Sequence, residues 1–400
     1  MGRRYREKLR RQSETSSSAK NLSSDPKVVA LLQWLNRQGY QESVPLRLSG
    51  FSDTGRGLMA LDKIPSKKVI ISIPIDLMIT RNYVLGQLMM DKESSTQEAF
   101  AVFLVKETAR GTQSWWSHYL GTLPASYTVP FFCQVQEIQI LPKYLEQKIR
   151  DQQHDVNAAF GKMRASLFPD LDWDRFCWAW FTVNTRAVYL KGSALNIPDC
   201  LALAPFLDMF NHSSEVVVTV GLSGTGDAYE IVTECGIERF SEAFINYGPH
   251  DNLKLCLEYG FVIPNGKNTN DSVSVTIDEL LEEYVDSKTD KKLEIIADQD
   301  LADKMNVHAS GISWNVLACL WILDLEKSKI KDWHLVFQTD LQDTAFKSVL
   351  IPILSKKLEE IQRSLSRISE FQCPTPALEV VQVLLREHDR ILSDNLNRLE

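Results

Sequence analysis

The strand-like sequence of this chain falls into two separate blocks, and a long helical stretch lies between them. The first block holds the turn-rich segment Gly50–Leu61 and the β-branched segment Lys68–Ile75 (KVIISIPI). A helical pattern then runs from about Gln97 to Leu190, and short strands return between Val216 and Tyr247. Short β-branched segments bounded by glycine and proline are typical of strands in small sheets. The pattern therefore predicts an α+β fold with small sheets and long helical sections.

Residues that begin and end helices bound several of these elements. Asp25 can cap a helix, Pro26 suits the first helical position, and Gly39 suits the exit from it. Ordered structure is therefore expected to begin at about Asp25. Further helices are predicted where apolar and aromatic residues repeat at helical spacing. These are residues 99–106, 145–168 and 173–183.

Turn residues locate the strands. Pro74 cannot donate a ladder hydrogen bond, so Lys68–Ile75 is expected to place it at a sheet edge or at the strand end. The segment SGTGD, residues 223–227, separates Val216–Val220 from Tyr229–Val232 and predicts a hairpin turn. A further short strand is predicted at Ala243–Tyr247.

The section from about Asp271 to the C-terminus has a helical pattern again. Apolar residues spaced by three and four form two stripes, which predict two helices packed in a bundle. A dimerising coiled coil is the alternative, but the stripes are shorter than the three to four heptads that it requires. We therefore expect a monomer. The stripes are Leu354, Leu358, Ile361, Leu365 and Ile368, and Val381, Leu385, Leu392 and Leu399.

The N-terminal segment 1–24 is rich in arginine, lysine and serine (MGRRYREKLRRQSETSSS) and low in apolar residues. Such a segment buries too little apolar surface to order itself, so a disordered tail is predicted. A cluster of basic residues is also typical of a nuclear address or an arm that contacts nucleic acid. A purely solvated tail explains it equally well. The start lacks the apolar stretch of a secretory signal, so cytoplasmic and nuclear locations are expected.

Composition excludes several classes of protein. The formal net charge is −8, so the chain as a whole does not attract nucleic acid, although it can accept a basic protein segment. No apolar run reaches the roughly 20 residues of a membrane-spanning helix, so no membrane partner is expected. The seven cysteines are scattered and none form a C-x-x-C pair, and no histidines lie at ligand spacing. Neither a disulfide framework nor a metal site is predicted.

Four short segments, far apart in the sequence, combine glycine with polar and aromatic residues. Taken singly, each has an ordinary structural explanation, such as a turn, a helix end or a strand end. Their order and combination are more specific. The segments are Thr54–Leu58 (TGRGL), Asn184–Arg186 (NTR), Asp208–His212 (DMFNH), and Ile245–Gly248 (INYG) followed by Leu257–Phe261 (LEYGF).

In this order, the G-R-G-L turn, the D-x-x-N-H segment, the I-x-Y-G segment and the Y-G-F ending resemble those of SET-domain protein methyltransferases. The N-T-R element and the helical region after Y-G-F are similar to those of the branch named after the Rubisco large-subunit lysine methyltransferase. The resemblance runs from roughly Val44 to the C-terminus. It implies S-adenosylmethionine as cosubstrate, no metal, and a lysine-bearing protein, such as a histone tail, as substrate.

The resemblance also implies a layout. Residues 25–262 would form a SET domain with small sheets and a knot-like core, split by a helical insertion at about 97–190. Residues 271–400 would form an all-helical substrate-binding domain. Only Cys319 and Cys373 follow Y-G-F, so the cysteine–zinc cluster that many histone-directed SET enzymes carry there is not expected.

By the same resemblance, one set of residues would hold S-adenosylmethionine. Glycine lets main chain approach a ligand closely, so the G-x-G turn would contact the methionyl end. Arg186 would hold the cosubstrate near the substrate channel, and Asp208 falls where relatives contact cosubstrate or substrate. Asn211 and His212 would line the adenine pocket, through backbone groups as much as side chains. The turn residues concerned are Thr54, Gly55 and Arg56.

The resemblance assigns catalysis to Tyr247 and Tyr259. The Tyr247 hydroxyl would orient the reacting groups and stabilise developing charge, and would also contact the cosubstrate. Tyr259 would form part of the channel wall, where an aromatic face suits a lysine side chain, although core packing explains it equally well. A branch member that methylates histidine lacks a tyrosine there, so Tyr259 favours lysine. The alternatives are a protein-histidine methyltransferase and a non-catalytic binding module built on the SET scaffold.

Overall fold

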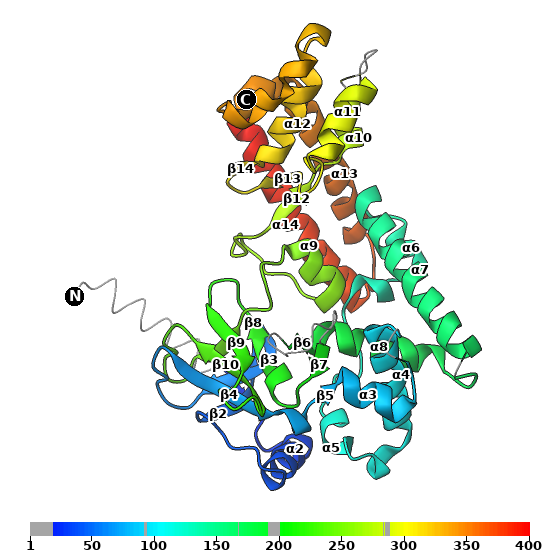
Figure 1. The fold of residues 1–400 in the computed structure, drawn as a ribbon, viewed down its shortest axis with the longest axis vertical. Coiled ribbons are helices and arrows are strands. Elements are labelled where there is room, and N and C mark those ends of the chain that lie inside the picture. The colour runs from blue at the N-terminus through cyan, green and yellow to red at the C-terminus, as the bar shows by residue number, and fades with distance from the viewer. Residues whose placement is uncertain (1–18, 92–93, 167, 191–200, 283, 285–288) are drawn as a thin grey trace, which may run out of the picture. The chain divides into compact units, whose positions relative to one another are not determined.

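The computed structural model describes residues 19–91, 94–166, 168–190, 201–282, 284 and 289–400. The chain divides into two compact units, each built from two segments (Figure 1). The first unit is Met1–Tyr127 with His154–Pro249, and the second is Thr128–Gln153 with His250–Glu400. Residues 128–153 of the insertion thus group with the C-terminal section. The domain ranges expected from the sequence, 25–262 and 271–400, stay a prediction.

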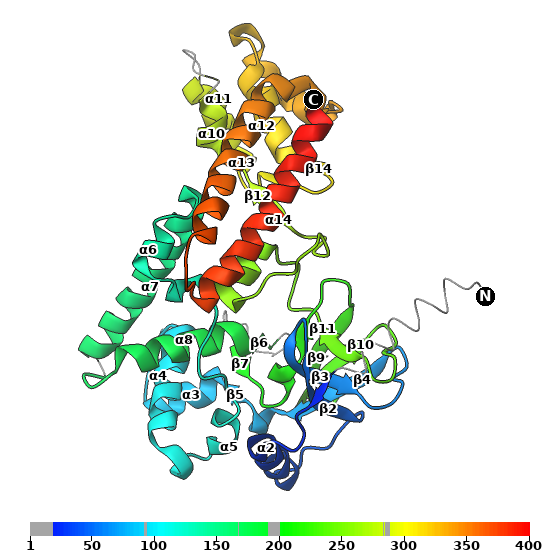
Figure 2. The same cartoon turned by 180° about the vertical axis from the view of Figure 1, so that it is seen from behind.

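The first unit is organised around a five-stranded sheet whose strands come from both blocks of strand-like sequence. β8 pairs in parallel with β11, and β11 pairs antiparallel with β3. Because β3 precedes the helical insertion while β8 and β11 follow it, the sheet joins distant parts of the chain (Figure 2). In sheet order the strands are β1 (Lys20–Asn21), β2 (Leu46–Phe51), β3 (Gly55–Ala60), β11 (Glu242–Ile245) and β8 (Asn211–His212).

Two three-stranded sheets complete the β-structure described in this unit. Pro74 is the last residue of edge strand β4, and Ser223–Asp227 forms the turn between β9 and β10, so both sequence predictions are confirmed. The bounds of β9 lie two residues later than predicted. The sheets are β4 (Lys68–Pro74), β10 (Ala228–Thr233) and β9 (Val218–Leu222), and β5 (Ile79–Thr80), β7 (Leu201–Leu203) and β6 (Ala187–Tyr189).

The predicted helices form, with bounds that differ by a few residues. The Asp25 side chain accepts a hydrogen bond from Lys27 N at 2.9 Å and caps the first helix, as its sequence predicts. The buried core of α4 packs against the aromatic face of α8. Residues of α7 belong to both units. The helices are α2 (Pro26–Arg37), α3 (Arg81–Leu88), α4 (Thr96–Ala109), α5 (Ser117–Leu120), α7 (Lys143–Ser166) and α8 (Trp173–Arg186).

Two features of this unit differ from the expectations. Described structure includes residues before Asp25, because Lys20–Asn21 pair antiparallel with β2 and Leu22 N donates to Leu48 O at 3.1 Å. Main-chain pairing to an open sheet edge does not require apolar side chains, so composition did not signal it. The helical stretch also ends at Arg186 rather than Leu190, and strand β6 follows. The rest of the predicted disordered tail, residues 1–18, lies outside the described residues.

The second unit is mainly helical, and α13 packs against α14 along the predicted stripes. Leu354, Ile361 and Ile368 are buried on α13, and all four predicted stripe residues of α14 are buried. This section is not all-helical as expected, because it also contains a small three-stranded sheet that the sequence pattern did not reveal. Its strands are β12 (Ser272–Ser274), β13 (Asn306–His308) and β14 (Gly311–Ile312). Its helices are α6 (Val135–Ile138), α9 (Asn252–Lys254), α10 (Ile277–Leu281), α11 (Thr289–Asp298), α12 (Trp314–Asp324), α13 (Lys347–Ser369) and α14 (Pro376–Leu399).

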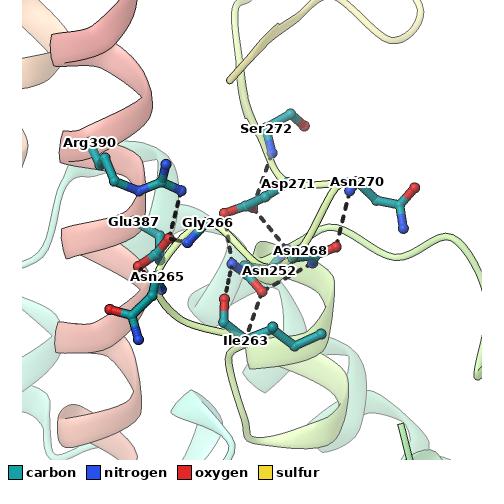
Figure 3. Close-up of polar contacts among 10 residues, drawn as sticks. All are labelled: Asn252, Ile263, Asn265, Gly266, Asn268, Asn270, Asp271, Ser272, Glu387 and Arg390. Atoms are coloured by element: carbon teal, nitrogen blue, oxygen red, sulfur yellow. Dashed lines mark hydrogen bonds and ion pairs between the residues drawn. The ribbon is translucent and has the colours of Figure 1, made fainter. Parts of the chain in front are cut away.

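A buried polar network holds the segment that follows Y-G-F (Figure 3). The Asp271 carboxylate accepts hydrogen bonds from Asn252 N at 3.0 Å, Asn252 Nδ2 at 2.7 Å and Ser272 N at 3.0 Å. Glu387 of α14 accepts hydrogen bonds from the backbone N–H groups of Asn265 and Gly266. Because Asp271 is buried, its pKa rises from 3.8 to about 6, although these N–H donors oppose the shift.

We expect Asp271 to lower the stability of the protein as pH rises from about 4 to about 6. In this window the folded state keeps the proton on Asp271 and the unfolded chain loses it. The free energy of unfolding then falls by roughly 1.4 kcal/mol per pH unit. Asp271→Asn cannot titrate, so the variant-minus-wild-type difference in urea unfolding should rise with that slope. A difference independent of pH would contradict the prediction.

Candidate active site

The G-R-G-L segment begins strand β3, directly after the turn at residues 52–54 that joins it to β2. Gly55 has φ +72°, a left-handed conformation that favours glycine, and a Cβ placed there would meet no described atom within 4 Å. Its backbone is therefore open on that side. Gly57 has the opposite surroundings, because a Cβ there would collide with the Glu242 carboxylate and lie 2.7 Å from Asn211 Nδ2. Glycine is thus favoured at the two positions for different reasons: by the backbone conformation at Gly55 and by lack of space at Gly57.

The side chain of Asn211 joins this turn to the strand that carries D-x-x-N-H. Its Nδ2 donates to Arg56 O at 2.9 Å, to Thr54 O at 3.3 Å and to Glu242 Oε1 at 2.7 Å. An amide nitrogen carries two hydrogens, so these three acceptors use its donor capacity fully. Any contact of Asn211 with a ligand is left to its other polar groups.

Glu242, the first residue of β11, is a site residue that the sequence reasoning missed. Its Oε2 accepts a hydrogen bond from Thr54 Oγ1 at 2.6 Å, while Oε1 accepts from Asn211. Burial raises the pKa of this carboxyl, and the hydrogen bonds from Thr54 and Asn211 oppose the shift. A single glutamate at the start of a strand carries no signal in the sequence, because most such residues are solvated.

A second cluster forms around Asp208, whose side chain is 1% exposed. Asp208 Oδ2 accepts from Tyr119 Oη at 3.0 Å and pairs with Arg186 Nη1 at 3.2 Å, and Arg186 Nη1 also donates to Asp208 O at 3.0 Å. Burial opposes the charge of Arg186, but the Asp208 carboxylate, together with Tyr127 and Tyr119, raises the pKa of the guanidinium overall. Arg186 Nε and Asp208 Oδ1 are buried with no hydrogen-bond partner among the described residues. Such atoms are candidates to meet a bound ligand.

Arg56 connects the two clusters. Its Nη1 donates to Thr122 O at 3.0 Å, and its pKa is lowered by partial burial of the guanidinium and by the nearby positive charge of Arg186. Because Thr122 O is neutral, the Arg56 guanidinium can still attract an anionic group of a ligand, although the Asp208 and Asp25 carboxylates partly balance the charge of the two guanidinium groups.

Tyr247 is held from both ends. Its hydroxyl donates to Phe210 O at 2.6 Å, and its backbone N–H donates to His212 Nδ1 at 3.1 Å. The rings of His212 and Tyr247 stack with their centroids 5.1 Å apart. Phe206, which precedes this segment, is fully buried with φ +72°, an uncommon conformation for a bulky residue. Strain of this kind clusters at functional sites.

Most of the residues singled out from the sequence therefore meet in the first unit. They group as Thr54–Arg56 with Asn211, Arg186 with Asp208, and His212 with Tyr247. Tyr259 belongs to the second unit, where it stacks on His250 with ring centroids 5.9 Å apart. Its role as a channel wall stays a prediction, as do the ligand contacts assigned to the other residues. Tyr119 and Glu242 are the additions that the structure makes.

Among the described residues, no three His, Cys, Asp or Glu side chains are grouped so that they could hold a metal ion. Nor does any described helix combine the length and the apolar character needed to cross a membrane.

Sequence comparison identifies the family. The SET domain profile matches residues 55–248, which include every residue of the three groups above except Thr54. SET domain-containing protein 4 of Mus musculus is 32% identical over 98% of this chain and 95% of its own length. This chain belongs to the SET-domain family. The Homo sapiens protein of the same name is also 32% identical, over 94% of this chain and 92% of its own length.

More distant proteins match this SET protein in sequence or in fold. The ribosomal lysine N-methyltransferase set11 of Schizosaccharomyces pombe is 26% identical over 65% of the chain and 67% of its own length. The crystal structure of the SET domain of LSMT bound to lysine and AdoHcy superposes with a TM-score of 0.67 at 21% identity, covering 94% of this chain and 93% of that one. Rubisco LSMT bound to AdoMet gives 0.65 at 20% identity with the same coverage.

We expect Gly57→Ala to destabilise the SET fold by about 1–3 kcal/mol, because the added methyl group displaces Glu242 and Asn211. Gly86→Ala in α3 is the matched control. A Cβ at Gly86 meets no described atom within 4 Å, and alanine stabilises a helix by about 0.5–1 kcal/mol relative to glycine. Urea unfolding of both variants checks this. Equal stability of the two would refute the assigned role of Gly57.

Proposed function

We propose that this chain is an S-adenosylmethionine-dependent protein-lysine N-methyltransferase. The main support is that the Asn211 side chain and the pairing of β8 with β11 bring three of the sequence motifs together. Asn211 binds the Thr54–Arg56 turn, and the strand that contains it pairs with the strand that leads into Tyr247. The glycine turn, the D-x-x-N-H segment and the tyrosine thus form one site in a chain of the SET-domain family.

The residues present fit S-adenosylmethionine, which supplies a methyl group on a sulfonium. The open backbone at Gly55 admits a ligand, and the buried Arg186 Nε and Asp208 Oδ1 lack partners in the described part of the chain. Thr54, Gly55 and Arg56 would hold the methionyl end, and the positive charge of Arg56 and Arg186 suits its carboxylate. Backbone groups of Asn211 and His212 would hold the adenine, since Asn211 Nδ2 is already used.

Tyr247 would position the substrate amine. The hydroxyl proton is donated to Phe210 O. Toward the substrate, the Tyr247 oxygen would therefore act as a hydrogen-bond acceptor and not as a donor. Because the ring and the backbone of Tyr247 are both held in place, its oxygen can accept a hydrogen bond from the amine and stabilise developing positive charge. Stacking on His212 restricts the ring further, which reduces the entropy lost when the substrate binds.

The substrate amine must be neutral before it can accept a methyl group. For a lysine with pKa near 10.4, deprotonation at pH 7 costs about 4.6 kcal/mol. Partial removal of the amine from water in the site would disfavour the charged ammonium and reduce that cost. Water can carry the proton away, so no side chain needs to act as a strong base.

Lysine is preferred to histidine as the methyl acceptor. Set11 of S. pombe is named a ribosomal lysine N-methyltransferase, and the LSMT structure is described as bound to lysine. Actin-histidine N-methyltransferase of Gallus gallus also matches this chain, at 26% identity over 82% of it, but over only 58% of its own length.

A non-catalytic binding module would not need Arg186, Asp208 and Tyr247 to be held together with the open turn.

The finer parts of the proposal concern target and location. A histone tail or another basic protein segment would suit an acidic enzyme with net charge −8. Action in both cytoplasm and nucleus would follow from the basic N-terminal segment. A monomer is the form proposed, because the apolar stripes are shorter than a dimerising coiled coil requires. Contact with nucleic acid would involve the basic segment alone.

We expect Tyr247→Phe to bind S-adenosylmethionine with an affinity within about threefold of wild type and to lower kcat by roughly 100-fold or more. Calorimetry measures the first and transfer of labelled methyl into a protein lysate the second. Tyr229→Phe is the matched control, because Tyr229 also donates to a backbone carbonyl, Tyr189 O, at 3.3 Å in the same unit. Wild type that binds no cosubstrate would overturn the proposed function.

Peptides that contain the target site, identified from the labelled proteins, should show whether the enzyme methylates lysine or histidine. We expect a peptide with lysine at the target position to be methylated and its matched lysine-to-histidine counterpart to react at least about 100-fold more slowly. Mass spectrometry of both peptides measures this. Faster methylation of the histidine peptide would assign the enzyme to protein-histidine methyltransferases.

A further inference from the structure

Glu242 is the one acidic side chain, among the described residues, that hydrogen-bonds to both the glycine turn and the D-x-x-N-H segment. Its Oε2 accepts from Thr54 Oγ1 at 2.6 Å and its Oε1 accepts from Asn211 Nδ2 at 2.7 Å. Asn211 Nδ2 in turn donates to the carbonyls of Thr54 and Arg56. The carboxylate and the amide together bind the turn through its side chain and its backbone.

The strand arrangement places this carboxylate under the turn. Glu242 and Ala243 begin β11 and pair with β3, and the last two residues of β11 pair with β8. Residue 57 is a glycine at the point where the carboxylate and the amide pass beside the backbone. A side chain at position 57 and the Glu242 carboxylate cannot occupy this space together. The second glycine of G-R-G-L therefore makes room for Glu242.

A carboxylate is costly at this position, which argues against simple space filling. Burial raises its pKa, so the surroundings oppose its charge, and an apolar residue would avoid that cost. Charge-assisted hydrogen bonds are about twice as strong as neutral ones and are directional. What the carboxylate adds is a fixed orientation of Thr54 and of the Asn211 amide.

We infer that Glu242 is a positioning residue for the cosubstrate, holding the Thr54–Arg56 turn in its binding conformation through Thr54 and Asn211. This inference rests on the proposed function, because the turn is the segment assigned to S-adenosylmethionine. Glu242 need not touch the ligand. It acts by reducing the ordering of the turn that binding would otherwise require.

The kinetic test uses Glu242→Gln, which keeps the size of the side chain but removes its charge and one acceptor. We expect KM for S-adenosylmethionine to rise about tenfold or more, the loss expected for a hydrogen bond to a charged group, with kcat within twofold of wild type. Glu238→Gln is the matched control. Glu238 lies nearby in the sequence, its side chain is 70% exposed and forms an ion pair with Lys63 at 2.8 Å, so its KM should not change.

A double-mutant cycle tests whether Glu242 acts through Thr54. Thr54→Val removes the hydroxyl and keeps the shape of the side chain. If the two residues form one unit, the double variant should raise KM no more than about twofold beyond Glu242→Gln alone. Fully multiplicative effects would show that Glu242 acts independently of Thr54 and would overturn the inference.

Hydrogen exchange of the protein without cosubstrate provides a readout that does not depend on activity. We expect Glu242→Gln to speed exchange at least about fivefold in peptides that cover the turn, and to leave α4 and α8 unchanged. Unchanged exchange in the turn, or faster exchange throughout the unit, would overturn the positioning role. Faster exchange in the turn with an unchanged KM would show that the order of the turn does not affect cosubstrate binding. That result would also overturn the positioning role.

The two proposals fail in different ways. Wild type that binds no S-adenosylmethionine overturns the proposed function and, with it, the link between Glu242 and the cosubstrate. Wild type that binds and transfers methyl groups, with Glu242→Gln indistinguishable from it in KM and in exchange, overturns only the role of Glu242.

Discussion

The parallel pairing of β8 with β11 is the constraint on which the candidate site depends. Phe244 lies opposite Asn211 and Ile245 opposite His212, so this short register sets where the D-x-x-N-H segment lies relative to Tyr247. β11 also pairs with β3, which brings the glycine turn to the same sheet. A shift of one residue would move Asn211 and His212 each to the other face of the sheet, since side chains alternate along a strand. The positions of all three motifs therefore follow from two strand pairs.

Polar side chains then convert this strand arrangement into a site with defined chemistry. Asn211 and Glu242 fix the turn, the Asp208 carboxylate holds Arg186 and Tyr119, and Phe210 O and His212 fix Tyr247. Each interaction is directional, and those cited here are at least partly buried, which strengthens a hydrogen bond relative to one at the surface. Buried charges that are costly alone are tolerated here because each has a partner. This degree of pre-organisation is what methyl transfer between two aligned groups requires.

The sequence predicted local structure well, because local structure depends on neighbouring residues. Asp25 and Pro26 bounded the first helix, Pro74 marked a strand end, and residues 223–227 formed the hairpin turn. The stripes of α13 and α14 were also found, because a periodic apolar pattern needs a packing partner. The features it missed depend on main-chain pairing or on single polar contacts. These are β1 beside β2, the sheet β12–β13–β14, and the carboxylate of Glu242.

By itself, the sequence determined most of the long helices and several of the strands, and it supplied the ordered motifs that place the chain in the SET-domain family. It also supplied the chemical groups, including Tyr247, Arg186 and Asn211. Only the tertiary structure decided what these groups do to one another: that Asn211 Nδ2 is used by the turn, that Arg186 is held by Asp208, and that Glu242 lies beneath Gly57. The reason is physical. A hydrogen bond requires two atoms about 3 Å apart, and the spacing of residues along a chain does not specify which distant atoms meet at that distance.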